Sequence, residues 1–323
     1  MMNSIEQYQK FIGCAIDDLS LPKTPHNLYE PITYFLGLGG KKMRPVLTLM
    51  GCELFNDDYS NAKEAALAVE LFHNFSLIHD DIMDEAPLRR GHETVHQKWD
   101  ANVGILSGDA LLIVAYQKIA TYTPELIGKL LPLFNQTALE VCEGQQYDMD
   151  FESRDNVSID EYIDMIKFKT AVLLGCSLQM GAIIGGANHA DAKELYNFGV
   201  NLGLAFQLQD DILDVYADQN KFGKQVGGDI IANKKTYLLL KAYEQANSNQ
   251  TERLNVLANE KDNSIKVTAV KAIYYDLDIK AKAESKMNHF YKIALDNLKA
   301  INISDIKKKP LLNLAHYLMG REV

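Results

Sequence analysis

The apolar residues between Ala62 and Asp84 recur every three or four positions without a break. This is the period of an α-helix, so the segment predicts one long and mostly buried helix. The segment Thr123-Pro124-Glu125 and the capping box Ser158–Glu161 mark the starts of two more helices. Similar periodicity predicts helices at about residues 104–122, 124–148, 159–187 and 190–218, with a more polar helical region after residue 233.

These helical segments follow one another without a low-complexity linker, and runs that alternate apolar and polar residues are few. A chain of 323 residues is long enough for one large core. The sequence therefore predicts an all-α fold, a single domain over residues 1–323 built as a bundle of long helices.

The composition excludes some classes of partner. There are 33 Lys and Arg residues against 43 Asp and Glu, which gives a formal net charge of −10. Such a surface does not attract nucleic acid or anionic membranes non-specifically. Four cysteines without a C-x-x-C pair are expected to be buried, reduced thiols, namely Cys14, Cys52, Cys142 and Cys176. With no signal peptide at the start, the expected location is cytoplasmic.

The longest uncharged stretch, Thr170–Ala187, is long enough to be considered as a membrane span. Ser177, Gln179 and four glycines interrupt it, which favours a closely packed internal helix. We therefore expect no membrane span.

Two segments share the pattern D-D-x-x-D near the ends of predicted apolar helices, Asp80–Asp84 and Asp210–Asp214. Helical residues four apart lie one above the other, so each segment places its first and last carboxylates on one face. Like charges in apolar surroundings are costly unless cations neutralise them. Hard oxygen ligands suit Mg²⁺, which shares its coordination sphere with water and substrate phosphates. The alternative is a pair of solvated acidic helix ends.

Basic residues gather in three glycine-bearing segments, Gly39–Pro45, Arg89–Gly91 and Phe222–Lys235. Two of these segments follow the acidic motifs along the chain. Guanidinium forks and lysine charges are the groups that bind diphosphate. A single basic cluster is usually a solvated surface, but three of them beside acidic motifs indicate an anionic ligand.

The motifs and their order along the chain resemble those of the trans-prenyl diphosphate synthases, the family of the farnesyl and geranylgeranyl diphosphate synthases. The resemblance extends from Gly39 to Lys234, with a weaker match at Tyr317–Arg321. The matching segments are G-G-K-K-M-R-P, H-N-F-S-L-I-H-D-D-I-M-D, R-R-G, G-Q-Q-Y-D at residues 144–148, F-K-T at residues 168–170 and F-Q-L-Q-D-D-I-L-D. The resemblance implies a prenyltransferase of the isoprenoid synthase fold, with both acidic motifs at the mouth of a central active-site cavity.

It also implies roles for individual residues. The ligands of Mg²⁺, bound as a set of three ions with substrate, would be Asp80, Asp84 and Asp210, with Asp81, Asp211 and Asp214 assisting directly or through water. The allylic diphosphate would be gripped by Arg89, Lys169, Lys224 and Lys234. Isopentenyl diphosphate would be held by Lys41, Arg44, His73 and Arg90. Thr170 and Gln207 would face the allylic carbocation.

The implied reaction begins with cleavage of the allylic C–O bond, as cations stabilise the leaving diphosphate. The isopentenyl double bond then attacks the carbocation, and apolar walls exclude water. Phe75, five residues before Asp80, resembles the aromatic residue that accompanies a geranylgeranyl (C20) product, with farnesyl (C15) as runner-up. Ideal helical rotation places Ser76 more directly beneath Asp80 than Phe75, and Phe72 lies one turn deeper. The alternative interpretation is that Phe75 is an ordinary core residue with no role in product length.

Three other functions remain as alternatives. The segment His92–His96 reads H-E-x-x-H, a zinc peptidase signature, although its polar surroundings make a poor buried metal helix. A class I terpene cyclase would also ionise an allylic diphosphate, but would not need a second diphosphate site. A non-catalytic synthase subunit would have lost an acidic motif, and both are intact here. The resemblance further implies a homodimer.

Overall fold

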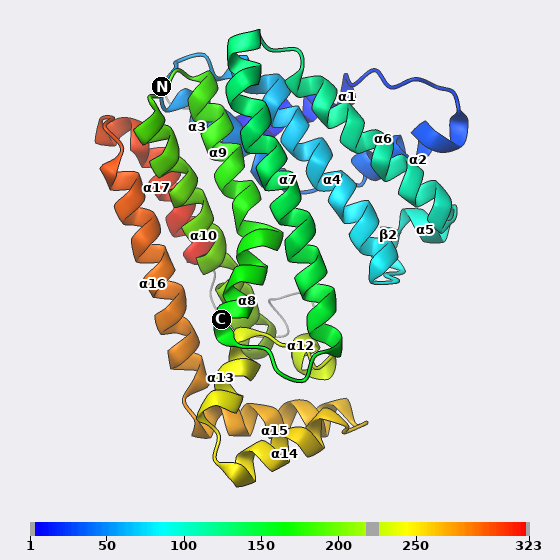
Figure 1. Cartoon of the computed structure of the whole chain (residues 1–323), viewed down its shortest axis with the longest axis vertical. Helices are drawn as coiled ribbons and strands as arrows, with labels where there is room; N and C mark the ends of the chain where they lie inside the picture. Colours follow the sequence, from blue (N-terminus) through cyan, green and yellow to red (C-terminus); the bar gives the residue numbers. More distant parts are fainter. Residues whose placement is uncertain (1–3, 218–225, 321–323) are drawn as a thin grey trace. The chain divides into compact units, whose positions relative to one another are not determined.

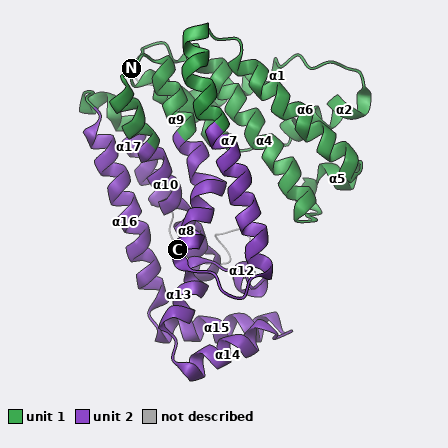
Figure 2. Cartoon of the chain, viewed as in Figure 1, with its two compact units in different colours: residues 1–135, 176–196, 302–310 green, residues 136–175, 197–301, 311–323 purple. Residues whose placement is uncertain are grey.

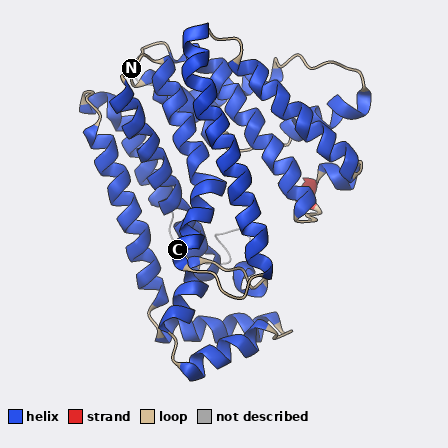
Figure 3. Cartoon of the chain, in the orientation of Figure 1, coloured by secondary structure: helices blue, strands red, loops and turns tan. Residues whose placement is uncertain are grey.

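Helices make up nearly all of the regular structure in the computed structural model, which describes residues 4–217 and 226–320 (Figures 1 and 3). The strands in the described part of the chain are β1 (Leu88–Arg89) and β2 (His92–Glu93), which pair as one antiparallel hairpin. The all-α prediction is therefore confirmed.

The chain divides into two compact units (Figure 2). Unit 1 comprises residues 1–135, 176–196 and 302–310, and unit 2 comprises residues 136–175, 197–301 and 311–323. Four of the five boundaries between the units fall within helices, namely α7 (Pro124–Ser153), α9 (Val172–Ile184), α10 (His189–Tyr216) and α17 (Asp305–Met319). The prediction of a single domain is not tested by this division and stays a prediction.

Unit 1 is organised around the helix α4 (Lys63–Met83). All residues from Ala65 to Phe72 are buried, so the predicted long internal helix is confirmed. Its packing partners include α3 and α6. The other elements of unit 1 are α1 (Ile5–Asp17), α2 (His26–Gly37), α3 (Met43–Glu53), the 3₁₀ helix η1 (Tyr59–Ala62), α5 (Val95–Lys98) and α6 (Ala101–Ile119).

Unit 2 contains a continuous helical run in which α8 (Ile159–Ile166) passes through the π-helical turn η2 (Lys167–Ala171) into α9. The predicted capping box at Ser158 and Glu161 begins this run. The remaining helices of unit 2 are α12 (Gly228–Ile231), α13 (Tyr237–Gln245), α14 (Ser248–Ala258), α15 (Asn263–Asp276) and α16 (Ile279–Ala300).

Glycines let α9 approach α3 closely within unit 1. A Cβ atom on Gly181 would lie 2.0 Å from the Thr48 carbonyl oxygen, and one on Gly51 would lie 2.4 Å from that of Leu178. Backbone contact this tight is possible only without side chains. The segment Ile159–Ile184 is apolar enough to be considered as a membrane span, but 61% of its most apolar window is buried inside the structure. Both observations favour the predicted internal helix.

The cysteine prediction is correct in part. All four thiols are free, and Cys52 and Cys176 are buried, but Cys14 and Cys142 are exposed. The expectation of burial fails for these two because they lie on outward faces of α1 and α7.

Candidate active site

The first acidic motif occupies the last turn of α4. The backbone N–H of Asp84, the C-cap residue, donates to the Asp80 carbonyl at 2.8 Å, which holds these two residues one turn apart. Asp80 is half-buried and Asp84 is exposed, whereas Asp81 is buried. The side chain of Asp81 accepts from Arg89, with an Nη2–Oδ1 distance of 2.7 Å. The middle carboxylate therefore fixes a predicted phosphate-binding arginine.

A tight hairpin turn presents the two arginines. Arg90 and Gly91, between β1 and β2, have φ of 54° and 81°. Positive φ at both central positions is the geometry of a type I′ turn, which glycine adopts readily and arginine does not. Backbone strain of this kind persists where the surrounding structure requires it and is common at functional sites.

The loop before α3 meets this hairpin. The guanidinium of Arg90 donates to the Gly39 carbonyl and lies against Gly40. A Cβ atom on Gly40, whose φ is 134°, would lie 2.8 Å from Cζ of Arg90. Position 40 therefore needs glycine for two reasons, its backbone conformation and the closeness of the Arg90 guanidinium.

His73 on α4 joins the same basic group. Its Nε2 atom lies 3.0 Å from Nη1 of Arg44. Arginine can only donate, so Nε2 accepts and the ring proton belongs on Nδ1. Burial and the positive charges of Arg44, Arg90 and Arg89 hold the pKa of His73 well below its usual range. The ring is therefore neutral at physiological pH.

Glu70 places a buried carboxyl group close to this basic group. It is 4% exposed, one turn before His73 on α4. Burial raises its pKa, whereas Asn74 and the positive charges of Arg44, Arg90 and Lys42 act in the opposite direction. Unit 1 thus brings together three of the four residues predicted to bind the second diphosphate, Arg44, His73 and Arg90, while Lys41 is exposed in the adjoining loop.

The second acidic motif lies near the end of α10, in unit 2. Asp211 is 4% exposed, and its Oδ2 atom accepts from the Tyr162 hydroxyl at 2.5 Å. Burial raises the pKa of Asp211 to about 8, and the negative charge of Asp229 adds to this, while hydrogen bonds from Tyr162 and Gln207 oppose it. The middle carboxylate of this motif is thus held inside the unit, as Asp81 is in the first.

Asp214 anchors the chain that returns after α10. Its Oδ2 atom accepts from the backbone N–H of Asp229 at 3.0 Å, and its carbonyl accepts from that of Gly227 at 2.6 Å. Lys234 follows on this returning segment, with its Nζ atom 3.9 Å from Oδ1 of Asp229. The predicted residue Lys224 lies outside the described residues.

The F-K-T motif lies on the π-helical turn η2. The Lys169 Nζ atom is 2.5 Å from Oδ2 of Asp148 on α7. One turn earlier on α7, a Cβ atom on Gly144 would lie 2.2 Å from the backbone nitrogen of Lys169. The spacing of G-Q-Q-Y-D thus has a physical cause, because Gly144 admits the widened turn and Asp148 binds its lysine. π-Helical turns are frequent at functional sites.

Sequence reasoning assigned no site role to four of these residues, Glu70, Asp148, Tyr162 and Asp229. For Asp148 a signal existed, because it lies four residues after Gly144 and both share a helix face. Glu70 could have been found as an acidic residue in an apolar helix. Nothing in the local sequence identifies Tyr162 as the partner of Asp211.

The donor atoms fit Mg²⁺, since the outer residues of both motifs offer carboxylate oxygens. Among residues 4–217 and 226–320, no three His, Cys, Asp or Glu side chains gather closely enough to hold an ion by themselves. Water and substrate phosphate oxygens would have to complete the coordination sphere, as Mg²⁺ prefers.

The zinc peptidase signature does not form the helix that zinc binding needs. His92 and Glu93 form β2, and α5 begins only at Val95, after the N-cap residue Thr94. The two histidines therefore do not lie one turn apart on one helix.

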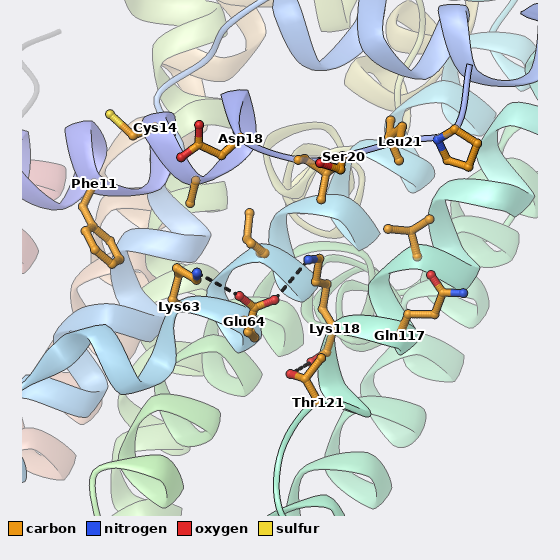
Figure 4. Close-up of a pocket in the computed structure, with 15 residues that line it drawn as sticks. Phe11, Cys14, Asp18, Ser20, Leu21, Lys63, Glu64, Gln117, Lys118 and Thr121 are labelled. Carbon is orange, nitrogen blue, oxygen red and sulfur yellow. Dashed lines mark hydrogen bonds and ion pairs between the residues drawn. The ribbon is translucent and has the colours of Figure 1, made fainter. Parts of the chain in front are cut away.

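Each unit also has a cavity. That of unit 1, about 510 Å³, lies beside α1, and Glu64 in its wall contacts Lys63 and Lys118 at 3.2 and 3.1 Å (Figure 4). None of the predicted site residues lines it. The cavity of unit 2 is about 1360 Å³, and Asp229 and Lys234 are among its lining residues.

Comparisons with known proteins agree with the motifs. The profile of the family described as polyprenyl synthetase matches residues 25–277. A geranylgeranyl pyrophosphate synthase of Geoglobus acetivorans is 35% identical over 98% of both chains. A short chain isoprenyl diphosphate synthase of Methanothermobacter thermautotrophicus is 34% identical over 100% of this chain and 99% of its own. A crystal structure of a geranylgeranyl pyrophosphate synthase superposes with a TM-score of 0.94, at 45% identity over 100% of both chains.

Proposed function

Because the chain belongs to the polyprenyl synthetase family, we propose that it is a short-chain trans-prenyl diphosphate synthase. It is a prenyltransferase that condenses isopentenyl diphosphate with an allylic diphosphate. The observation that carries this proposal is the pair of D-D-x-x-D motifs, in each of which the middle carboxylate is bound within its own unit while the outer two flank it on one helix face.

Isopentenyl diphosphate is held by the basic group of unit 1. Arg44 and Arg90 offer guanidinium donors, Lys41 offers an ammonium group from its exposed loop, and neutral His73 orients Arg44. The carboxyl group of Glu70 lies close to Arg44 and Arg90 and offsets part of their mutual repulsion when it is ionised. A terpene cyclase has no need for this second diphosphate site, so the group favours a synthase.

The allylic diphosphate is held by the two acidic motifs and the cations near them. Asp80, Asp84 and Asp210 are the proposed Mg²⁺ ligands, with three ions bound alongside substrate. Bound Mg²⁺ supplies charge stabilisation for the departing diphosphate. Arg89, Lys169, Lys224 and Lys234 offset the charge that remains, and Asp81 and Asp148 orient Arg89 and Lys169.

Residues of unit 2 then act on the carbocation. Gln207 donates its amide N–H to Asp211, which leaves its carbonyl oxygen as the atom that faces the cation. Thr170 follows Lys169 on the π-helical turn and would offer its hydroxyl oxygen to the same cation. These oxygens stabilise positive charge without adding water, and the apolar helices exclude solvent from the reaction. The departing diphosphate takes the proton that the product cation loses.

The product is geranylgeranyl diphosphate, with farnesyl diphosphate as the second candidate. Phe75 lies half-buried on α4, five residues before Asp80, or about 7.5 Å along the helix. The hydroxyl of Ser76 donates to the His73 carbonyl at 2.9 Å, so it is engaged within α4. The aromatic ring of Phe75 is thus the better candidate for the floor that stops chain growth.

The synthase acts as a cytoplasmic homodimer. Helix α6 exposes Ile105, Leu106 and Ile113, and the last two lie two turns apart on one face. Exposed apolar residues that share one helix face are candidates for a subunit interface. Light scattering after gel filtration tests this, and a Leu106→Glu variant that elutes like the wild-type chain would place the interface elsewhere.

The function is tested by incubating the purified chain with Mg²⁺, isopentenyl diphosphate and dimethylallyl or farnesyl diphosphate. Mass spectrometry should detect a longer prenyl diphosphate that requires isopentenyl diphosphate and disappears with EDTA. A cyclic product made without isopentenyl diphosphate would indicate a terpene cyclase, and no turnover would indicate a non-catalytic subunit.

A further inference from the structure

Five aromatic rings form a continuous series inside unit 1. It begins with His79 and Phe75, whose ring centroids are 4.7 Å apart, and continues from Phe75 to Phe72 at 5.6 Å. Phe72 meets Phe134 of α7 edge-on at 5.4 Å, and Phe134 meets Tyr116 of α6 at 5.2 Å. The series therefore connects α4, which carries the first acidic motif, to α6 and α7.

The rings of this series differ in how far they are buried. Phe72 and Phe134 are 1% and 0% exposed, whereas Phe75 and Tyr116 are half-buried. Phe75 lies between His79 and Phe72 in the series, so contact with both neighbours holds its half-buried ring in one rotamer. Interiors are close-packed, so the loss of a buried ring lets the adjacent side chains shift toward the space it leaves.

We propose that Phe134 is a positioning residue for product length, which acts by holding Phe72 against Phe75. The edge-on contact with Phe134 prevents Phe72 from turning away from Phe75. Phe75 therefore keeps the position in which it stops the growing prenyl chain. Tyr116 supports Phe134 from its other side and contributes in the same direction with a smaller effect. This inference rests on the proposed function and extends the length-setting floor from α4 to α7 and α6.

The first test compares the products of wild-type, Phe134→Leu and Tyr116→Leu chains from isopentenyl and farnesyl diphosphates. For Phe134→Leu, the ratio of longer products to the wild-type product should rise at least about tenfold, the lower end of what one methylene of pocket space changes. Tyr116→Leu, which removes a less buried ring, should shift the ratio in the same direction by less. Phe75→Ala, which opens the floor directly, provides the upper limit.

The matched control is Phe35→Leu, because Phe35 is also 0% exposed, lies in α2 of the same unit and is outside the ring series. It should lower the melting temperature as Phe134→Leu does but leave the product spectrum unchanged. Unchanged products in both Phe134→Leu and Tyr116→Leu would overturn the proposal. So would an equal lengthening in Phe35→Leu, since general loosening would then explain the effect.

The second test asks whether Phe134 acts through Phe72. If it does, Phe134→Leu should add almost nothing to the lengthening already caused by Phe72→Ala, since the ring that it positions is gone. Independent lengthening in the double variant would contradict this route. Failure of the proposed function would look different, because the wild-type chain itself would then form no prenyl diphosphate.

Discussion

Both carboxylate oxygens of Asp81 accept hydrogen bonds from Nε of Arg89, each at 2.8 Å. Asp81 is 1% exposed, and the arginine reaches it from the β-hairpin that follows α4. The middle residue of the first acidic motif thus holds an arginine rather than facing solvent with its neighbours. In the second motif Tyr162 binds Asp211 in the equivalent position.

Asp81→Asn should therefore weaken the fold as well as catalysis. Replacing the buried carboxylate leaves the guanidinium of Arg89 without its counter-charge, which should lower the free energy of unfolding by about 2 kcal/mol. This is less than the usual cost of breaking a buried ion pair, because Arg89 remains partly exposed. Urea denaturation measures this. Asp84→Asn is the matched control, since Asp84 is exposed, and it should reduce kcat while leaving stability within about 0.5 kcal/mol. If both variants had the same free energy of unfolding, the stabilising ion pair assigned to Asp81 and Arg89 would be contradicted.

Gly40→Ala should weaken the binding of isopentenyl diphosphate. The added methyl group displaces the Arg90 guanidinium from Gly39, and the loss of one such hydrogen bond corresponds to about a tenfold increase in KM. The KM for the allylic substrate should change much less. Gly37→Ala is the control, since a Cβ atom there has no neighbour within 4 Å. An unchanged KM in Gly40→Ala would show that Arg90 does not serve this substrate.

Gly144→Ala should distort the π-helical turn that carries Lys169 and lower kcat at least about tenfold, because misplacing a catalytic group slightly is already costly. Gly128→Ala lies on the same helix in open space and should stabilise the chain by about 0.5–1 kcal/mol with normal turnover. Steady-state kinetics on both variants separates a local from a general effect. Normal kcat in Gly144→Ala would contradict a catalytic role for the turn.

Stability should fall in acid partly because of His73. Its pKa is depressed in the folded state, so below about pH 6.5 the unfolded chain binds a proton that the folded chain does not. The stabilising contribution of the neutral ring is therefore present above that pH and is lost as the pH falls below it. Urea denaturation of His73→Gln at pH 7 and pH 5 should show a smaller decrease than the wild-type chain. An equal decrease would assign the acid sensitivity to other groups.

Much of the fold could be predicted from the sequence, because its signals are local. The apolar period around α4 and the capping box at Ser158 depend only on residues within a few turns, and both have the predicted structure. Helical spacing alone also predicts that the first and last carboxylates of each D-D-x-x-D motif share one helix face. The exposure of Cys14 could not be predicted, since it depends on which face of α1 is covered.

The partners of the site residues could not be predicted for a related reason. Tyr162 and Asp211 are 49 positions apart, and Lys169 and Asp148 are 21 apart. Such pairs form through the packing of helices, which no local pattern encodes. The π-helical turn at residues 167–171 likewise depends on the space that Gly144 leaves on another helix.

The most direct test of the account is the turnover of Asp80→Ala and Asp210→Ala with Mg²⁺, isopentenyl diphosphate and an allylic diphosphate. If both acidic motifs serve the cleavage of one C–O bond, each variant should lose at least about 100-fold in kcat. The kcat of the double variant should be only slightly lower than that of the less active single variant, because the effects of residues that act as a unit are not additive. Asp57→Ala, at an exposed carboxylate paired with Lys307, should keep normal kcat. Near-normal turnover in either single variant would contradict the account.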